Sequence, residues 1–202
     1  MTNITSLRPG EHFMFKGFEW VCLDPNHPDG GVLAIMAKPW AKDVKFCPSD
    51  KFEDEKGNWN NYRTSLLHKE VLNLIKVIGT DNLILHEVDL VADNGDRAYN
   101  TVIVRDDVFV LTCDEYRKYR ELIPHYDDWI WTATPWWCSY KDSVLGRACS
   151  VRVVSTAGNF NRGNACYGNS VVPACILNPA HLNLRQSMAY VEEREEKENE
   201  TD

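Results

Sequence analysis

The residue types best suited to molecular recognition are concentrated between Trp129 and Leu177. Runs of β-branched residues in this segment alternate with stretches rich in Trp, Tyr, Asn, Arg and Gly. Aromatic side chains give a large contact area at low entropic cost, and Asn, Ser and Gly give adaptable hydrogen bonds, as in the binding loops of antibodies. The composition therefore predicts a binding surface rather than an active site. Its predicted members are Trp136, Trp137, Ser139, Tyr140, Asn159, Phe160, Asn161, Arg162, Asn164 and Tyr167.

The adjacent tryptophans Trp136 and Trp137 follow Pro135 and are the predicted anchors of this surface. Neighbouring side chains of an extended backbone point in opposite directions, so both indoles cannot point inward. We expect at least one of them to be exposed or to lie at an interface, where tryptophan is a common anchor. The alternative is a tryptophan that folds back over its own loop.

Motifs of the common catalytic sites are absent from the sequence. It contains no H-E-x-x-H, G-x-S-x-G or Walker A motif, no dinucleotide-binding fingerprint and no EF-hand loop. Its six histidines are dispersed along the chain, so none of them marks a local metal site. We therefore expect no enzymatic activity, no cofactor and no metal ion.

The seven cysteines fit buried thiols in a reducing compartment. Their number is odd, no C-x-x-C occurs, and most lie in apolar runs. A zinc site would need Cys138, Cys149, Cys166 and Cys175 to converge, and their spacings match no common zinc pattern. Cys138 could act as a nucleophile only with a base beside it, and His125 is the nearest histidine in the sequence.

Two groups of acidic residues could have a chemical role. The segment Asp93-Asn94-Gly95-Asp96 could bind calcium through side-chain oxygens, but a type I′ turn at Asn94-Gly95 is the favoured interpretation. Asp127 and Asp128 could act as a carboxylate pair. Adjacent strand residues point to opposite faces, so a solvated loop is favoured there as well.

Length, charge and hydropathy limit the classes of protein that fit. The 202 residues suggest one domain, which we place at residues 1–180, followed by an acidic tail, residues 181–202, that is frayed or disordered. The net charge of −8 argues against nucleic acid as a partner, because its backbone requires a basic face. No apolar run approaches the roughly 18–20 residues of a membrane span, and no signal peptide is apparent. We therefore expect synthesis in the cytoplasm and no membrane insertion.

The hydrophobic pattern predicts an α+β protein. Strands are expected at residues 13–23, as a hairpin, and at residues 32–37. A helix should begin at Thr64 or Ser65 and end at Gly79. Short strands at 83–85 and 101–104 precede a strand at 108–111, which leads into a second helix. That helix should begin with the capping box of Thr112 and Glu115 and end at Pro124, before a β-rich C-terminal half.

Several segments, taken in order, carry a resemblance to a known family. They are Phe18–Leu23, Asn60–Leu67 with Val71–Asn73, Asp107–Thr112 with Glu115-Tyr116, Trp131–Pro135 and Val171–Ala174. With these segments the sequence resembles phage and gut-bacterial domains of unassigned function with a C-type-lectin-like fold, which are related in architecture to formylglycine-generating enzymes and to the variable proteins of diversity-generating retroelements. The resemblance covers roughly residues 10–178, with Trp131-Thr132-Ala133-Thr134-Pro135 standing where the family usually has Trp-Leu-Arg-Ser-Pro.

The resemblance implies a C-type-lectin-like fold with two helices and a β-rich C-terminal half. It implies a non-enzymatic module that binds a protein or glycan ligand on a cell surface, with residues 136–169 in the position that varies in retroelement-diversified relatives. Association with a virion and oligomer formation would both fit. The alternatives are an oxidoreductase of the formylglycine-generating type, which would use copper and Cys138, Cys149 or Cys166, and a structural virion or assembly subunit.

Overall fold

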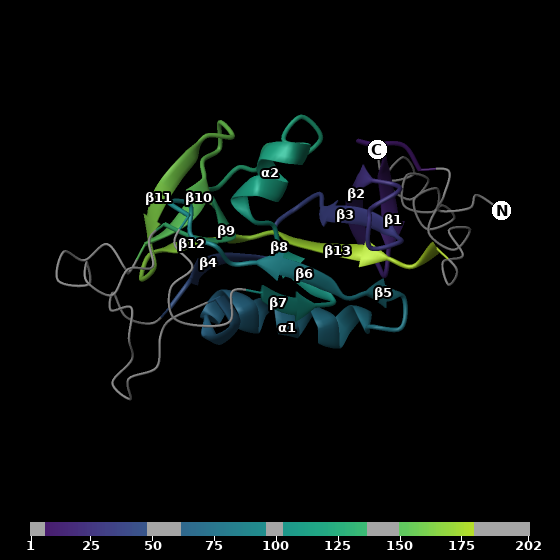
Figure 1. The fold of residues 1–202 in the computed structure, drawn as a ribbon, viewed down its shortest axis with the longest axis horizontal. Coiled ribbons are helices and arrows are strands. Elements are labelled where there is room, and N and C mark those ends of the chain that lie inside the picture. The colour runs from purple at the N-terminus through teal and green to yellow at the C-terminus, as the bar shows by residue number, and fades with distance from the viewer. Residues whose placement is uncertain (1–6, 48–61, 96–102, 137–149, 180–202) are drawn as a thin grey trace, which may run out of the picture.

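The fold belongs to the α+β class, as the sequence predicted. The structure is a computed structural model and describes residues 7–47, 62–95, 103–136 and 150–179. Within these ranges, two α-helices pack against strands that form three sheets. Figure 1 shows the helices α1, Leu66–Ile78, and α2, Cys113–Tyr119, on opposite sides of the long strand β13, Pro173–Leu177.

The first sheet begins with the predicted N-terminal hairpin. Its strands β1, His12–Phe15, and β2, Phe18–Asp24, are joined by Lys16 and Gly17. Both of these residues have positive φ, 52° and 81°, which matches the right-handed twist of the flanking strands in a two-residue hairpin. The sheet order is β1-β2-β3-β13-β5, and β8 also pairs with β13. The added strands are β3, Val32–Met36, β5, Leu83–Ile84, and β8, Val108–Val110.

The second sheet confirms the predicted β-rich C-terminal half within the described residues. Its order is β11-β10-β9-β12-β4, and β11 is an edge strand among the strands that are described. The pair of β12 and β9 is parallel, whereas the other pairs are antiparallel. The strands are β4, Ala41–Lys45, β9, Ile130–Pro135, β10, Ser150–Val154, β11, Phe160–Asn164, and β12, Gly168–Val171.

Close packing beneath β11 depends on Gly163. A Cβ at this position would lie 2.6 Å from Cγ1 of Val153 and 2.9 Å from the ring of Trp131. Trp131 is buried in the core, and its indole N–H donates to the carbonyl of Val44 at 2.6 Å. Because Gly163 has no side chain, β11 can pack directly against Trp131, whose hydrogen bond links β9 to β4.

Both helices begin where the capping residues predicted. In α1, the backbone N–H of His68 donates to Oγ of Ser65 at 2.9 Å, and Gly79 ends the helix with φ at 71°. In α2, Thr112 and Glu115 form the complete capping box. The predicted end of α2 at Pro124 is wrong, because the helix stops at Tyr119 and the chain turns to bury Ile123 in the core.

The third sheet pairs β6, His86–Asp89, with β7, Ile103–Asp106. The strand expected at residues 83–85 is divided in the structure, since β5 ends at Ile84 and β6 begins at His86. The type I′ turn predicted at Asn94-Gly95 is wrong. Such a turn needs positive φ at both residues, and only Gly95 has it, at 86°.

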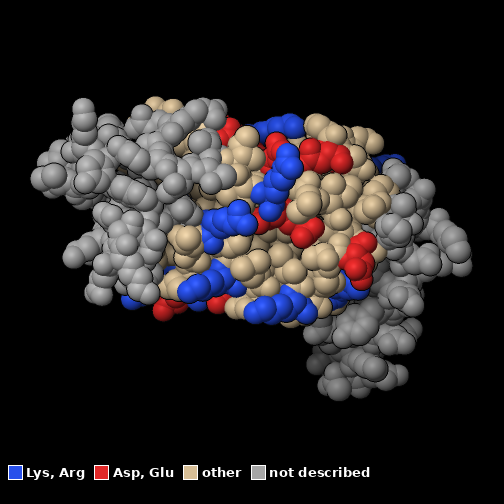
Figure 2. Space-filling model, turned by 60° about the horizontal axis from the view of Figure 1, so that its bottom comes forward, with Lys and Arg blue, Asp and Glu red and all other residues tan. Residues whose placement is uncertain are grey.

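Charges of both signs are mixed on the face of the molecule that Figure 2 shows. Lys and Arg side chains lie beside Asp and Glu side chains over this face, and they do not gather by sign. Nucleic-acid backbones are usually bound by a continuous basic patch or stripe. The described residues on this face do not form such a stripe.

Candidate functional site

A groove of about 510 Å³ runs beside α2 and is the candidate site. Its walls come from α2, from β6 and from the segment that follows β6. Two clusters of polar side chains contribute to it, one around His86 and one around Asp93. The other lining residues include His27, Glu87, Asp89, Thr112, Cys113, Asp114, Glu115, Arg117, Lys118, Tyr119 and Thr134.

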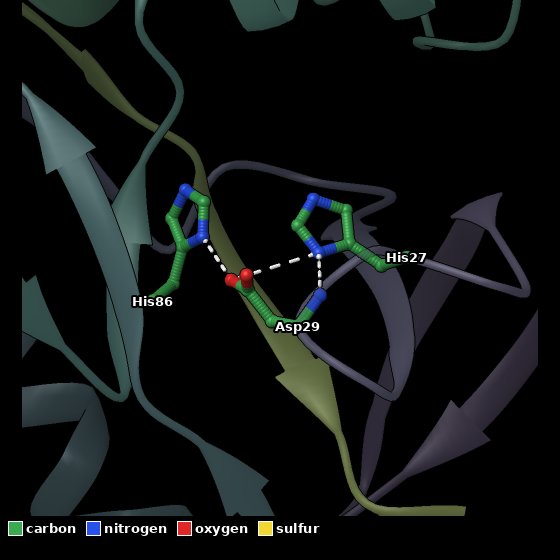
Figure 3. A group of neighbouring side chains, drawn as sticks. All are labelled: His27, Asp29 and His86. Atoms are coloured by element: carbon green, nitrogen blue, oxygen red, sulfur yellow. Dashed lines mark hydrogen bonds and ion pairs between the residues drawn. The ribbon is translucent and has the colours of Figure 1, made fainter.

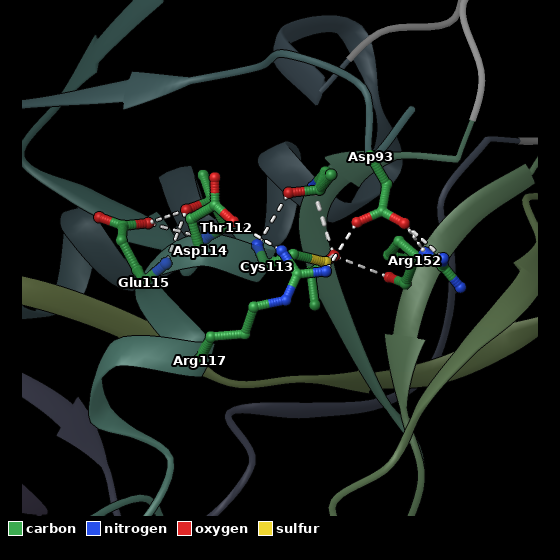
Figure 4. Close-up of polar contacts among 9 residues, drawn as sticks. Asp93, Thr112, Cys113, Asp114, Glu115, Arg117 and Arg152 are labelled. Atoms are coloured by element: carbon green, nitrogen blue, oxygen red, sulfur yellow. Dashed lines mark hydrogen bonds and ion pairs between the residues drawn. The ribbon is translucent and has the colours of Figure 1, made fainter. Parts of the chain in front are cut away.

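Asp93 binds two arginines from different elements. Its Oδ1 accepts a hydrogen bond from Nη2 of Arg117 at 2.8 Å, and its Oδ2 accepts one from Nε of Arg152 at 2.8 Å and another from Nη2 of the same guanidinium. Figure 4 shows the carboxylate between Arg117 of α2 and Arg152 of β10. The backbone N–H of Asp93 also donates to the carbonyl of Pro135 at 2.9 Å. This one residue therefore joins α2 and the second sheet.

The electrostatics of Asp93 follow from these contacts. Burial by itself would raise the pKa of the Asp93 carboxyl. Hydrogen bonds and charge from Arg117 and Arg152 act in the opposite direction and lower the pKa below its usual value. Both carboxylate oxygens are thus engaged by arginines, so the calcium interpretation of this segment is wrong for Asp93. Asp96 lies outside the described residues.

Each of these arginines also lies against an aromatic ring. The guanidinium of Arg152 lies 3.8 Å from the ring centre of Trp136, and that of Arg117 lies 4.9 Å from the ring centre of Phe160. These are distances at which a cation is attracted to the face of a π system. We name the sequence of contacts Phe160, Arg117, Asp93, Arg152 and Trp136 the Arg–aromatic row. At the centre of this row, the Asp93 carboxylate fixes the two guanidinium groups, and each guanidinium lies against one aromatic ring.

The structure brings some of the predicted binding residues to this row. Trp136 and Phe160 are its two ends, although both are half-buried. Phe160 is more enclosed than a surface anchor would be, because its ring also packs edge-on against Tyr116 at 5.4 Å. The Trp136 ring lies against Arg152 of the neighbouring strand β10, so this face of its indole is covered. Trp137, Ser139 and Tyr140 lie outside the described residues.

The remaining predicted residues lie on or next to β11. Strand alternation places Arg162 on the same face as Phe160, and Asn161 on the other face. Arg162 is exposed and lies directly across from Arg152 in the β10–β11 pair. Within the described chain, no ion pair or hydrogen bond satisfies the Arg162 guanidinium. The others are Asn159, which is exposed, Asn164, which is half-buried, and Tyr167, which is 66% exposed.

The second cluster is centred on His86 at the start of β6. Its Nδ1 lies 2.7 Å from Oδ2 of Asp29, and its Nε2 lies 2.7 Å from Oε1 of Glu115. The ring packs against Phe109, with 4.3 Å between ring centres, and meets His27 edge-on at 5.4 Å. The imidazole is therefore held on all sides by described residues.

Burial and hydrogen bonding act in opposite directions on this cluster. Burial disfavours the charged imidazolium, but the hydrogen bonds to Glu115 and Asp29 outweigh it and raise the pKa of His86. Burial likewise favours a neutral Glu115, but His86 and Thr112 outweigh it and lower the pKa of that carboxyl. For His27, burial is the largest effect and lowers its pKa.

Most of the described cysteines are buried, as the sequence predicted. Cys22, Cys113 and Cys175 are buried free thiols, Cys47 is also buried, and Cys166 is half-buried. Burial raises the pKa of the Cys113 thiol at the groove wall, and it raises the pKa of Cys22 to about 12. Cys166 contacts Asn164 rather than another thiol. Cys138 and Cys149 lie outside the described residues.

The acidic pair at Asp127 and Asp128 has a structural explanation. Asp128 accepts hydrogen bonds from the hydroxyl of Ser170 and from the backbone N–H of Trp129, both at 2.8 Å. His125 contacts the carbonyl of Thr156 at 3.1 Å. These contacts fix the chain ahead of β9, and they agree with a loop rather than a catalytic carboxylate pair.

Sequence reasoning missed the grouping of His27, Asp29 and His86. Asp29 and His86 are 57 residues apart, and no local spacing connects them. The sequence indicated one role of Glu115, in the capping box with Thr112. It gave no indication that Glu115 also contacts His86. Only the packing of α2 against β6 reveals it.

Comparison with known proteins gives no assignment, since no family model, curated protein or solved structure matches the chain. The functional argument therefore depends on the groove and its two clusters. Across the described ranges, neither helix has the length and apolar character needed to cross a membrane.

Proposed function

We propose that this chain is a non-enzymatic module that binds a protein ligand through the Arg–aromatic row and the adjoining strand β11. The observation that carries the proposal is the double engagement of Asp93, which fixes Arg117 and Arg152 while each guanidinium lies against an aromatic ring. Groups that are already ordered lose less conformational entropy on binding. The Arg–aromatic row is therefore better suited to binding a ligand than to catalysing a reaction.

The composition of the row favours a protein ligand over a glycan. Arginine and aromatic residues are enriched in the cores and hot spots of protein interfaces. In the row, one face of each aromatic ring is already covered by a guanidinium, so neither ring offers both faces to a sugar. Arg117 keeps 48% of its side chain exposed and can contact a partner without leaving Asp93.

The unpaired positive charge near β11 indicates an acidic segment as the ligand. Arg152 and Arg162 face each other across β10 and β11, and like charges in such a position are destabilising unless they are neutralised. Asp93 neutralises Arg152, and no described residue neutralises Arg162. A carboxylate from a partner could bind Arg162 through two parallel hydrogen bonds.

Strand β11 adds a second means of recognition. In the part of the chain that the structure describes, its outer edge pairs with no other strand. Such an edge can accept an extended peptide through backbone hydrogen bonds, while side chains on one face select its sequence. Together, the edge and Arg162 favour an acidic peptide segment in an extended conformation.

The proposal extends to a C-type-lectin-like fold. It is supported by the segments that carry the resemblance, since Phe18–Leu23 belongs to β2 and Trp131–Pro135 belongs to β9, whose Thr134 lines the groove. Trp136, Arg152 and Phe160 all come from residues 136–169, the stretch that varies in retroelement-diversified relatives. A rigid sheet that carries changeable residues is suited to that use. Display on a phage particle is part of the same proposal.

A displayed library of extended peptides tests this function. The intact chain should enrich peptides with Asp or Glu at alternate positions, and Arg162→Ala should weaken binding of the selected peptides by tenfold or more, as expected for an interface hot spot. Arg63→Ala is the matched control, since Arg63 is an exposed arginine beside α1, away from the row. Equal binding by wild type and Arg162→Ala would overturn the proposal. Binding to a glycan array that depends on Trp136 would show that the ligand is a sugar.

A further inference from the structure

We propose that His27, Asp29 and His86 form a binding site for a divalent transition-metal ion, with zinc as the best match, at the end of the groove beside α2. These three residues are the group that could hold a metal ion among the described residues. The site is separate from the Arg–aromatic row, and neither proposal requires the other.

The donor atoms converge on one point. Nδ1 of His86 lies 2.7 Å from Oδ2 of Asp29, Nδ1 of His27 lies 3.6 Å from the same oxygen, and all three atoms lie within 4.8 Å of one another. Tetrahedral zinc with bonds of about 2.0–2.1 Å separates its ligand atoms by roughly 3.3 Å. The contact between His86 and Asp29 must therefore open by roughly 0.6 Å, and small side-chain rotations can supply this movement. Figure 3 shows both imidazole rings directed at the Asp29 carboxylate.

The second nitrogen of His86 is already oriented by a carboxylate. Nε2 lies 2.7 Å from Oε1 of Glu115, whose other oxygen accepts hydrogen bonds from the backbone N–H and hydroxyl of Thr112, both at 2.7 Å. A carboxylate that accepts from the free N–H of a histidine ligand is the usual support of a metal site, because it fixes the ring and makes the other nitrogen more basic. Here the supporting carboxylate, that of Glu115, is itself fixed by Thr112 at the start of α2.

A tight turn holds His27 and Asp29 in position. Residues 27–31 are closed by hydrogen bonds from the N–H of Gly30 to the carbonyl of His27 at 2.8 Å and from the N–H of His27 to the carbonyl of Gly31 at 2.9 Å. The backbone N–H of Asp29 donates to Nδ1 of His27 at 3.3 Å, so this nitrogen acts as an acceptor. This nitrogen is therefore unprotonated, and a metal ion at the site would take its lone pair in place of this long hydrogen bond.

Charge and access also fit a divalent cation. With neutral histidines, the cluster contains two carboxylates, Asp29 and Glu115, and a dication would balance their charge. Asp29 keeps 36% of its side chain exposed, so a water molecule can approach from solvent as the fourth ligand. Two imidazoles and one carboxylate suit Zn²⁺, Ni²⁺ and Co²⁺ better than Ca²⁺ or Mg²⁺, which prefer oxygen ligands alone.

Metal titration of the full chain tests this inference. After treatment with a chelator and its removal, the protein should bind one equivalent of Zn²⁺ in competition with a chromophoric indicator, and Co²⁺ should give the visible spectrum of a tetrahedral site without thiolate bands. His27→Ala should reduce Zn²⁺ affinity by a hundredfold or more, and Glu115→Gln by about 10–100-fold. His12→Ala is the matched control, because His12 is an exposed histidine paired with a carboxylate, Glu19, outside the groove.

Each outcome decides the question. Asp29 is exposed on the same turn, so Asp29→Asn, which should also weaken Zn²⁺ binding, keeps the test valid if changes at His27, His86 or Glu115 unfold the protein. Zn²⁺ affinity that is the same in wild type and His27→Ala would overturn the site, and thiolate bands in the Co²⁺ spectrum would show that cysteines hold the ion instead. Arg162→Ala should bind Zn²⁺ normally, and His27→Ala should bind the selected peptides normally, so failure of one proposal is distinguishable from failure of the other.

Discussion

Glu115 contacts His86 at 2.7 Å, and this contact joins the first turn of α2 to the first residue of β6. The same carboxylate closes the capping box with Thr112. One side chain thus satisfies the orphan amides of a helix and fixes an imidazole in the groove wall. The position of α2 along the groove is therefore coupled to the orientation of His86.

Removing the capping hydroxyl should loosen this arrangement measurably. Thr112→Ala should lower the free energy of unfolding by about 1 kcal/mol, the usual cost of an N-cap, and should weaken Zn²⁺ binding because Glu115 loses a donor. Urea denaturation and the indicator titration measure the two effects. Ser65→Ala removes the cap of α1 instead, and it should lower stability by a similar amount without changing Zn²⁺ affinity. A loss of affinity in Ser65→Ala would refute the link between α2 and His86.

The carboxyl of Asp93 predicts a particular pH dependence of stability. Its pKa is lower in the folded chain than in the unfolded chain, so its contribution is complete above the unfolded value of about 4 and is lost as the pH falls through the lower folded value. The difference in free energy of unfolding between wild type and Asp93→Asn should thus be constant near neutral pH and shrink in acid. Near neutrality the difference should be about 1–3 kcal/mol. A difference that grows in acid would contradict the assignment.

A methyl group at position 163 should disturb the sheet beneath the binding edge. Gly163→Ala would place a Cβ 2.6 Å from Val153 and 2.9 Å from Trp131, so one of these neighbours must move. Overpacking of this kind costs about 1–3 kcal/mol. Thermal unfolding and tryptophan fluorescence would detect the loss of stability and the displaced ring. Asn161→Ala, two residues earlier on the same strand, removes atoms instead of adding them, and it should leave the fluorescence unchanged.

Replacing Trp136 separates aromatic stacking from size. Trp136→Phe keeps an aromatic face for Arg152, whereas Trp136→Leu keeps bulk without a π system. A cation–π contact contributes about 0.5–2 kcal/mol. We therefore expect Trp136→Leu to weaken binding of the selected peptides by roughly 2- to 30-fold, with a smaller loss for Trp136→Phe. Calorimetric affinities would show this order, and an equal loss in both variants would rule out a role for the stacked arginine.

Features set by local sequence were predicted well. The caps at Ser65 and Thr112 depend on residues within one helical turn, and the hairpin at Lys16-Gly17 depends on two residues that adopt positive φ. In each case, the residues that determine the structure lie within a few positions of the helix start or turn that they form. The early end of α2 was missed because it depends on where the core accepts Ile123, which the sequence near Pro124 does not encode.

The candidate site was predicted only in part, for a related reason. The two half-buried ends of the Arg–aromatic row were anticipated from composition, but Asp93, which holds the row, lies 59 residues before Arg152. The grouping of His27 with His86 likewise requires the first sheet and β6 to be placed beside each other. Contacts of this kind follow from tertiary packing, for which a single sequence carries no local pattern.

The strand β13 has a consequence for how the polypeptide is made. It hydrogen-bonds to β3, β5 and β8, yet it is the last strand of the described chain to be synthesised. The N-terminal strands therefore leave the ribosome without their central neighbour, and their edges stay open until residues 173–177 emerge. Closure over so long a sequence separation is slow compared with local helix formation. A nascent chain stalled before Pro173 should be sensitive to protease along its whole length, including the hairpin that was translated first.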